Sequence, residues 1–384
     1  MKTVAVIFGG RSTEHDISIM TAISSVIKPL ELSKDYIVHA VYINKAGEWF
    51  SDAKLKDIKF FQSGDINDWM NKTKSVRVLF KDGLTLIKPT KFGESKISVD
   101  IVFPAMHGTH GEDGELMGLL EMSGVAFVGC DMTSSAIAMD KVLAKQVTQS
   151  DGIISTPWVT INYSSVAKSS DLALQKIDSL KYPMFVKPAH LGSSIGISRV
   201  KDQEQLINAI EVAGHYDEKI IVEQEVSNLI EVTLPIIGND ELTLALLERP
   251  ILKDENFFGF ETKYMQGGKK GKNSDSKGSQ GYSELPANIP KDIYRNAEEV
   301  GVAVYRSLGC SGIARIDMLI DSKTKKVYFN EVNPLPGGLY AHNWRMKGIS
   351  PVELVTKLVD LAIDKKNKDD KYQTSFNTSY LKQF

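Results

Sequence analysis

The sequence predicts an α/β fold divided among two or three domains. The chain has 384 residues, which is more than one compact core usually holds. It opens with an apolar strand-like run at residues 3–8 that leads through Gly9-Gly10 into a helix, a common start of a parallel α/β sheet. Further along, pairs of short apolar runs are joined by turn residues and separated by amphipathic segments, which indicates hairpins packed against helices.

The composition is that of an ordinary globular protein, with 42% hydrophobic and 24% charged residues. The net charge of -2 gives no reason to expect nucleic acid or a membrane as partner, so we expect small-molecule substrates. Cys130 and Cys310 are too few for a disulfide framework or a zinc site. The opening apolar run is too short for a signal peptide, and no stretch is long enough to span a bilayer. These features predict a cytoplasmic protein.

The first helix is expected to begin at Ser12 or Thr13, which can cap it, and to run to about Ser24. Its N-terminal amides would face an anion. Glu14 falls in the first turn of this helix. Either a favourable interaction with the helix dipole or contact with a ligand explains a carboxylate there, and both interpretations stay open.

Strands are expected at residues 37–43 and 99–104, with a variable segment at 45–98 between them. A loop rich in glycine, histidine and acids follows at residues 107–121 and leads into a helix. His107 comes directly after the second of these strands, and loops in that position bind ligands in α/β proteins. A purely structural histidine is the alternative.

A glycine-rich hairpin is predicted at residues 182–200, where the strands 184–187 and 197–200 flank Gly192–Gly196. It differs from a Walker loop, which leads from a strand into a helix. Its backbone amides could close over phosphates with Lys187 adding a positive charge, or it could be a plain hairpin. A further strand at residues 219–224 ends in Glu223-Gln224, and the backbone at its edge could contact an adenine ring.

Toward the C-terminus we expect strands at 230–237 and 242–247 and helices at 290–308 and 351–363. Residues 265–281 have no apolar pattern and are predicted to form a mobile loop, either a lid or a disordered insertion. The charged run 364–371 is predicted to be a solvated tail.

A hairpin of residues 314–320 and 326–332 brings together Asp317, Glu331 and Asn333. Residues two apart in a strand share a face, and the hairpin can place Asp317 beside the other two. Carboxylate and amide oxygens suit Mg²⁺. Arg315 shares the face of Asp317. The alternative is that these are polar residues at strand ends.

Taken together, the chain resembles the D-alanine–D-alanine ligases of the ATP-grasp superfamily. The matching stretches are GGRSTEHDIS (9–18), HGTHGEDG (107–114), MDK (139–141), VKPAHLGSSIG (186–196), VEQ (222–224), ETKY (261–264), ARID (314–317) and NEVNPLPG (330–337). The resemblance implies a Rossmann-like pre-ATP-grasp domain at 1–129, followed by a two-lobed ATP-grasp fold. The central lobe would be residues 130–226 and the C-terminal lobe 227–384, with the mobile loop at 265–281 and ATP between the lobes.

The resemblance also implies roles for residues in the matching stretches. The residues implied to bind ATP are Lys141, Lys187, Ser194, Glu223, Gln224, Val226, Glu231 and Lys263. The residues implied to bind two Mg²⁺ ions, or Mn²⁺ in their place, are Asp317, Glu331 and Asn333. Glu14 would take the ammonium of the first D-amino acid, and His107 would lie near its carboxylate. Arg315 and the Gly337 amide would stabilise the tetrahedral intermediate, while Ser193 and Tyr264 would bond toward Glu14 and close the lid.

The implied reaction converts two D-alanines and ATP into the dipeptide, ADP and phosphate, for peptidoglycan synthesis in the cell wall. The first carboxylate would attack the γ-phosphate to give an acyl phosphate, which the second amine would attack. Positive groups are needed because several negative charges meet. A closing loop would protect the acyl phosphate from water. A homodimer formed through the N-terminal domain is also expected.

One stretch departs from the family pattern. His342 stands where the family usually has a serine that contacts the carboxylate of the second substrate. Pro334 replaces a common threonine, Met117 replaces a usual glutamine, and the loop after Tyr264 is longer than usual. Tyr264 argues against the D-Ala–D-lactate ligases. D-serine, another D-amino acid or another amine therefore stays open as second substrate, and a nucleotide-binding protein without catalysis is a remote alternative.

Overall fold

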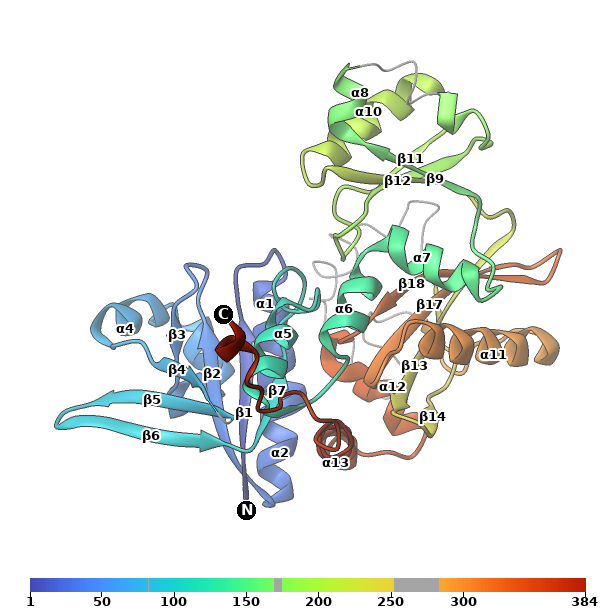
Figure 1. The fold of residues 1–384 in the computed structure, drawn as a ribbon. Coiled ribbons are helices and arrows are strands. Elements are labelled where there is room, and N and C mark those ends of the chain that lie inside the picture. The colour runs from blue at the N-terminus through green and yellow to red at the C-terminus, as the bar shows by residue number, and fades with distance from the viewer. Residues whose placement is uncertain (82, 169–174, 252–282) are drawn as a thin grey trace.

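The computed structural model describes the chain except residues 82, 169–174 and 252–282. The predicted loop 265–281 and the predicted site residues Lys263 and Tyr264 lie outside the described residues. Figure 1 shows three bodies: a domain built from the N-terminal part, a small lobe above, and a third body formed by the C-terminal half. None of the described helices is both long and apolar enough to cross a membrane.

The N-terminal domain is built on a sheet of order β3-β2-β1-β7-β8. Its strands are β1 (Lys2–Gly9), β2 (Tyr36–Ile43), β3 (Trp49–Phe50), β7 (Ile101–Pro104) and β8 (Ala126–Phe127), all parallel except β3. Alternate residues of β1 face opposite sides. Val4, Val6 and Phe8 pack with the first helices, whereas Ala5 and Ile7 pack with α5 (Glu115–Ser123). Strand order reverses between β1 and β7, where ligands of α/β sheets bind.

The first helical stretch differs from the prediction at both ends. The predicted cap at Ser12 or Thr13 is wrong: α1 is His15–Thr21, Glu14 is its N-cap residue, and Ser12 Oγ accepts a hydrogen bond from the Glu14 N–H at 3.0 Å. The helix also continues past Ser24, through a π-helical segment (Ala22–Ile27) into α2 (Lys28–Ser33). The residues after Ser24 stay helical because Val26, Ile27 and Leu30 are buried in the core with β1.

The segment 45–98, which offered no clear pattern, forms a second, antiparallel sheet of order β4-β5-β6. Its strands are β4 (Arg77–Phe80), β5 (Leu84–Thr90) and β6 (Gly93–Val99), and two short helices, α3 (Ile58–Gln62) and α4 (Ile66–Lys72), precede them. Leu84, Leu86 and Val99 share a core with Ile7 and Leu116, which ties this sheet to the main one.

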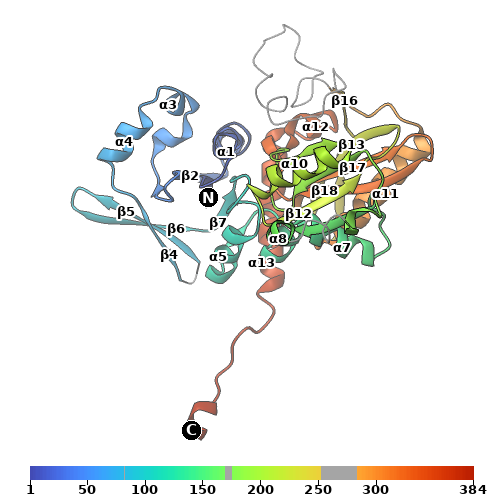
Figure 2. The same cartoon turned by 90° about the horizontal axis from the view of Figure 1, so that it is seen from above.

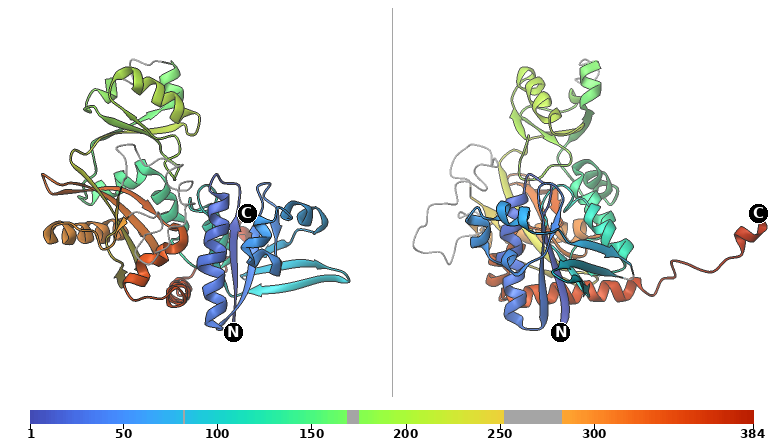
Figure 3. Two further views of the ribbon diagram at one scale, coloured as in Figure 1. Left: turned by 180° about the vertical axis from the view of Figure 1, so that it is seen from behind. Right: turned by 90° about the vertical axis from the view of Figure 1, so that its left-hand side faces the viewer.

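The small lobe is an antiparallel sheet of order β11-β10-β12-β9. It comprises β9 (Trp158–Asn162), β10 (Met184–Pro188), β11 (Ser198–Val200) and β12 (Lys219–Gln224), with helices α8 (Tyr163–Lys168) and α10 (Gln203–Gly214). The predicted strands of this lobe agree with β10, β11 and β12 to within one residue. Figure 3 shows that the lobe stands apart from the rest of the molecule, so its hairpin can overhang the bodies below.

The C-terminal body holds a sheet of order β14-β13-β17-β18, made of β13 (Leu229–Gly238), β14 (Leu242–Leu244), β17 (Gly312–Asp321) and β18 (Lys326–Asn333). Strands β15 (Arg249–Pro250) and β16 (Ser283–Glu284) pair separately. The predicted strand 242–247 ends early, because the N–H and C=O of Leu246 hydrogen bond to the Asn343 side chain. Helix α11 (Lys291–Ser307) packs on the sheet.

Several helices join one body to another. Helices α6 (Met132–Met139) and α7 (Lys141–Ser150) come from the range predicted for the central lobe, yet Ala138 and Ala144 share a core with Ile316 of the C-terminal sheet. After α12 (Ala341–Met346), helix α13 (Pro351–Asp369) packs Leu354 and Leu358 against the N-terminal core. Figure 2 shows α13 between the two bodies.

The charged run 364–371, predicted as a solvated tail, is helical for most of its length. Lys365 Nζ lies 2.9 Å from Asp131, the N-cap residue of α6, and Lys368 pairs with Asp240 in the turn between β13 and β14, so charged residues of α13 pair with the C-terminal body. Beyond it the chain runs out from the body as an exposed segment with a final turn at Tyr380–Gln383.

Candidate active site

Two adjoining cavities lie where the three bodies meet. The larger, of about 410 Å³, is lined by Glu14, His107 and Ser193 among others, and the smaller, of about 130 Å³, by Lys187, Glu223 and Asp317. Arg315, Glu331 and Tyr340 line both. These three residues therefore stand at the junction between a space on the N-terminal domain and a space under the small lobe.

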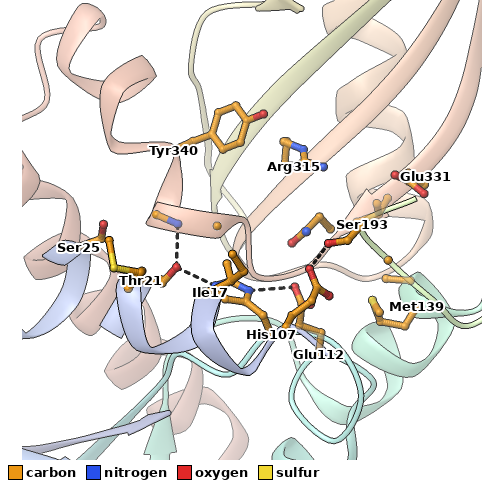
Figure 4. A pocket seen from close by; sticks show the side chains of 18 of the residues that line it. Ile17, Thr21, Ser25, His107, Glu112, Met139, Ser193, Arg315, Glu331 and Tyr340 are labelled. Carbon is orange, nitrogen blue, oxygen red and sulfur yellow. Dashed lines mark hydrogen bonds and ion pairs between the residues drawn. The ribbon is translucent and has the colours of Figure 1, made fainter. Parts of the chain in front are cut away.

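In the larger cavity, Glu14 meets the glycine-rich hairpin of the small lobe. The Ser193 hydroxyl donates a hydrogen bond to Glu14 Oε1 across 179 residues of sequence (Figure 4). Ser193 and Ser194 both have a left-handed backbone, at φ 54° and 59°. L-residues rarely adopt this conformation, and those that do are found often at ligand sites. A side chain at Gly108 would place its Cβ 2.9 Å from Glu14 Oε2, so glycine there leaves room for this carboxylate.

A chain of polar contacts forms one wall of the same cavity (Figure 4). Gly338 N donates to Thr21 Oγ1 at 3.0 Å, and Thr21 Oγ1 lies 2.8 Å from His107 Nε2. His107 Nδ1 lies 3.6 Å from Glu112 Oε1, and Gly108 N donates to the other Glu112 oxygen at 2.5 Å. Burial alone would lower the pKa of His107, but the Glu112 carboxylate outweighs it and holds that pKa above its ordinary value.

The predicted metal ligands are brought together by the β17–β18 hairpin. In its register Asp317 is opposite Glu331 and Arg315 is opposite Asn333, with an irregularity directly after Asp317. Arg315 donates to both Asp317 oxygens, at 2.7 and 2.5 Å, and Lys141 Nζ lies 3.7 Å from Glu331 Oε2. Two carboxylates and one amide on adjacent strands form an oxygen-only donor set, so these residues fit Mg²⁺.

The smaller cavity holds most of the residues predicted for a nucleotide. Lys187, Ser194, Glu223, Gln224, Val226 and Glu231 all line it. Glu223 is only 2% exposed, and its carboxylate pairs with Lys187 and with Lys145 Nζ at 2.8 Å. Burial would raise the pKa of Glu223, but the two lysines lower it to about 2. The carboxylate is therefore committed to lysines, and an adenine contact would come from the strand edge.

Lys145 was missed by the sequence analysis. It is fully buried, and its Nζ also donates to the Phe329 carbonyl at 3.3 Å. The available signal was its spacing, since it follows Lys141 by four residues on α7 and so shares a helix face with it.

The junction between the cavities is formed by Arg315 and Tyr340. The Arg315 guanidinium lies 5.2 Å from the centre of the Tyr340 ring. Burial raises the pKa of Tyr340 to about 12, so its hydroxyl stays neutral at physiological pH. Leu339 and Tyr340 are left-handed at φ 53° and 51°, next to Gly338 at 61°. Three consecutive residues of this kind turn the chain sharply, which presents both Gly337 and the Tyr340 ring to the cavity.

His342 is placed differently from the other predicted site residues. Its Nε2 lies 2.7 Å from Glu248 Oε2, and its ring centre is 5.0 Å from that of Tyr340. Among the described residues, those lining the two cavities do not include it. The structure therefore puts His342 behind Tyr340, against a buried carboxylate, and contact with a substrate stays a prediction.

Comparison with known proteins agrees with this geometry. The family described as D-ala D-ala ligase N-terminus matches residues 3–130, and that described as D-ala D-ala ligase C-terminus matches residues 147–360. The chain belongs to the D-alanine–D-alanine ligase family. Membership confirms the resemblance seen in the motifs.

Relatives in this family match nearly end to end. A D-alanine–D-alanine ligase of Caldicellulosiruptor bescii is 37% identical over 381 residues, covering 94% of this chain and 95% of the relative. Among solved structures, the VanG D-Ala:D-Ser ligase of Enterococcus faecalis is 31% identical with a TM-score of 0.75, covering 94% of this chain and 99% of its own. The D-alanine–D-alanine ligase of Coxiella burnetii is 26% identical with a TM-score of 0.77, covering 97% and 98%. The predicted fold, an N-terminal α/β domain followed by an ATP-grasp fold, is confirmed.

Proposed function

We propose that the protein is an ATP-dependent ligase that joins two D-alanine molecules, with release of ADP and phosphate. The observation that carries this proposal is the pair of adjoining cavities that share Arg315 and Glu331. The lining of the larger cavity, with Glu14 and His107, suits a small amino acid, and the lining of the smaller cavity, with Lys187 and the end of β12, suits a nucleotide. Reaction between the two ligands would take place at the junction. Family membership supports the same activity.

The first D-alanine would bind in the larger cavity. The Glu14 carboxylate, 7% exposed and held by Ser193, would take its ammonium group. His107, whose pKa is raised, would lie near its carboxylate and offset that charge. This orientation points the carboxylate toward Arg315, Glu331 and the nucleotide.

ATP would bind in the smaller cavity. Lys187 and Ser194 would face its phosphates together with Lys141 of the larger cavity, and Glu223, Gln224, Val226 and Glu231 would line its adenosine. Asp317, Glu331 and Asn333 would hold Mg²⁺, two ions by the family resemblance, and Mg²⁺ when bound neutralises the charge of the phosphates. The carboxylate of D-alanine attacks the γ-phosphorus, the bond to the β-phosphate oxygen breaks, and an acyl phosphate and ADP result. The predicted roles of Lys263 and Tyr264 stay predictions.

The second amine then attacks the acyl carbon. Arg315 and the Gly337 amide would stabilise the oxyanion that forms before phosphate leaves. The hairpin at Ser193, already in contact with Glu14, would keep water from the acyl phosphate.

The acceptor is the least constrained part of this proposal. His342 pairs with Glu248 instead of lining a cavity, and one similar structure is titled a D-Ala:D-Ser ligase. A ligase that takes D-serine or another amine second is therefore the alternative. A panel of acceptors offered with limiting D-alanine separates the two, because the alternative fails if all acceptors other than D-alanine give no mixed product.

Phosphate release from ATP, Mg²⁺ and D-alanine tests the main proposal. We expect release that depends on D-alanine, with D-alanyl-D-alanine detected as product, and its loss in Glu14→Gln. No release above background with any acceptor, despite tight ATP binding, would indicate a nucleotide-binding protein. The expected homodimer is tested separately by light scattering.

A further inference from the structure

We propose that Thr21 is a positioning residue for the ligase reaction, whose hydroxyl joins the His107–Glu112 pair to the loop that presents the Gly337 amide. The inference rests on the proposed function for its kinetic part. The hydrogen bonds of Thr21 connect three elements that are remote in sequence: helix α1, the loop after β7, and the turn after β18.

Thr21 is placed for this role by the periodicity of its helix. Glu14, Ile17, Thr21 and Ser24 follow one another at spacings of three or four residues, and all line the larger cavity. Thr21 is the last residue of α1 and is followed by the π-helical segment. Such segments often mark functional positions. Both described hydrogen bonds of its hydroxyl lead to other elements, one across 86 and one across 317 residues.

The donors and acceptors can be assigned from chemistry. The Gly338 N–H can only donate, so it occupies one lone pair of Thr21 Oγ1. The Glu112 carboxylate can only accept and lies 3.6 Å from Nδ1, so its charge favours a proton on that nitrogen, although the distance is longer than a hydrogen bond. When His107 is neutral, the Thr21 hydroxyl therefore donates to Nε2. When His107 is charged, Nε2–H donates to Thr21, and the hydroxyl proton turns to a third acceptor.

The surroundings of His107 favour the second state more than water would, since they hold the pKa of His107 above its ordinary value. Glu112 Oε1 lies 3.6 Å from Nδ1, the negative charge of Glu14 adds to its effect on the pKa, and the positive charge of Arg315 opposes both. Thr21, His107 and Glu112 are each at most 3% exposed, so these bonds are largely shielded from water. In this state the free hydroxyl proton of Thr21 can meet the carboxylate of a substrate in the cavity that Thr21 lines.

The consequence for catalysis concerns the neighbouring Gly337. Gly338 and Leu339 adopt left-handed backbone, and the bond from the Gly338 N–H to Thr21 is the polar contact described between this turn and the N-terminal domain. Holding that N–H fixes the Gly337–Gly338 peptide plane, which is one of the two planes that meet at Gly337, and so narrows the directions open to the Gly337 N–H. An oxyanion donor must be aimed before the charge develops. Loss of the bond should thus reduce kcat more than it raises KM.

Thr21→Val and Thr21→Ser test the proposal, with Thr148→Val as matched control. Thr148 is also fully buried, but its hydroxyl donates within its own helix, to the Ala144 carbonyl at 2.8 Å. We expect Thr21→Val to lower kcat for phosphate release by about fivefold to a hundredfold, the effect of one lost buried hydrogen bond. Thr21→Ser should stay within about threefold of wild type, as should Thr148→Val.

A second measurement reports a change that a merely structural role would not produce. The pKa of His107, followed by NMR in the whole protein without ligands, should fall in Thr21→Val, because the imidazolium loses the acceptor at Nε2. It should be unchanged in Thr21→Ser and Thr148→Val. An unmoved pKa in Thr21→Val overturns the proposal, whether or not kcat falls. Equal losses in the Val and Ser variants overturn it as well. If the wild-type protein releases no phosphate, the proposed function has failed, and the titration still decides whether Thr21 is coupled to His107.

Discussion

Replacement of Glu223 by glutamine should destabilise the protein strongly, because Glu223 is the shared counter-ion of two buried lysines. Its carboxylate pairs with Lys187 and with Lys145 Nζ, the latter at 2.8 Å. At an effective dielectric constant of about 20, that distance corresponds to an attraction of roughly 6 kcal/mol. Desolvation of the charges offsets part of it. Removal of one partner from a buried pair leaves the other charge uncompensated and costs about 3–5 kcal/mol.

The pKa of Glu223 leads to a similar magnitude. In the folded protein it is lowered from 4.5 to about 2. A carboxyl group with a depressed folded pKa contributes stability above its unfolded pKa and loses it as the pH falls toward the folded value. The contribution is about 3 kcal/mol above pH 4.5 and vanishes near pH 2. The free energies of unfolding of wild type and Glu223→Gln should therefore differ by about that much at pH 7 and converge on acidification.

Urea unfolding followed by tryptophan fluorescence measures this difference. Trp158 is a suitable reporter, since it packs beside Ile221 of the strand that carries Glu223. Glu94→Gln is the matched control, because Glu94 pairs with Arg77 at the surface and its loss should change stability by less than about 1 kcal/mol. Equal stability of the two variants at pH 7, or a difference that persists near pH 2, would refute the reasoning.

Other predictions concern the reaction and the acceptor. Glu331→Gln should lower phosphate release by about a hundredfold or more while ATP still binds weakly, because a carboxylate predicted to hold Mg²⁺ is lost; turnover at the wild-type rate would rule out that assignment. His342→Ala should raise the pKa of Glu248, which His342 now holds below its usual range, and should lower stability by about 1–3 kcal/mol, with the loss greatest near neutral pH and smaller in acid. If the KM of the second D-alanine is unaltered in that variant, His342 does not contact the acceptor. Tyr340→Phe should keep kcat within about threefold and add no pH dependence below pH 10, since the ring over Arg315 is retained and the pKa of Tyr340 is about 12; a large loss would show that the hydroxyl takes part in the reaction.

Local sequence patterns were sufficient for most elements that carry the site. Strands β10, β12 and β17 are buried on one face or on both, so their apolar runs predicted their positions closely. The β17–β18 hairpin was readable because the turn residues lie between two such runs, and residue parity placed Arg315 on the face of Asp317. The exposed strand β6 and the short strand β8 were not predicted, because neither has a periodic apolar face.

Pairings between distant segments were not readable in the same way. The partner of His342 is Glu248, that of Glu223 is Lys145, and that of Thr21 is Gly338. Each pairing depends on how elements far apart in the sequence pack on one another, and no periodicity of the sequence records that packing. The end of β14 has the same origin, since the Asn343 side chain takes the hydrogen bonds of Leu246.

The sequence by itself therefore determined most of the strands that carry the site, the family, and the types of residue that we predict to bind ATP, Mg²⁺ and a first amino acid. Those properties depend on neighbours a few residues apart, which residue size and polarity control directly. Only the tertiary structure decided which charges are neutralised in the folded protein, that Tyr340 and not His342 stands at the cavity wall, and that Thr21 joins the two halves of the larger cavity. Those outcomes depend on burial and on contacts between segments far apart in the sequence, where the geometry of packing selects one partner among many of the same chemistry.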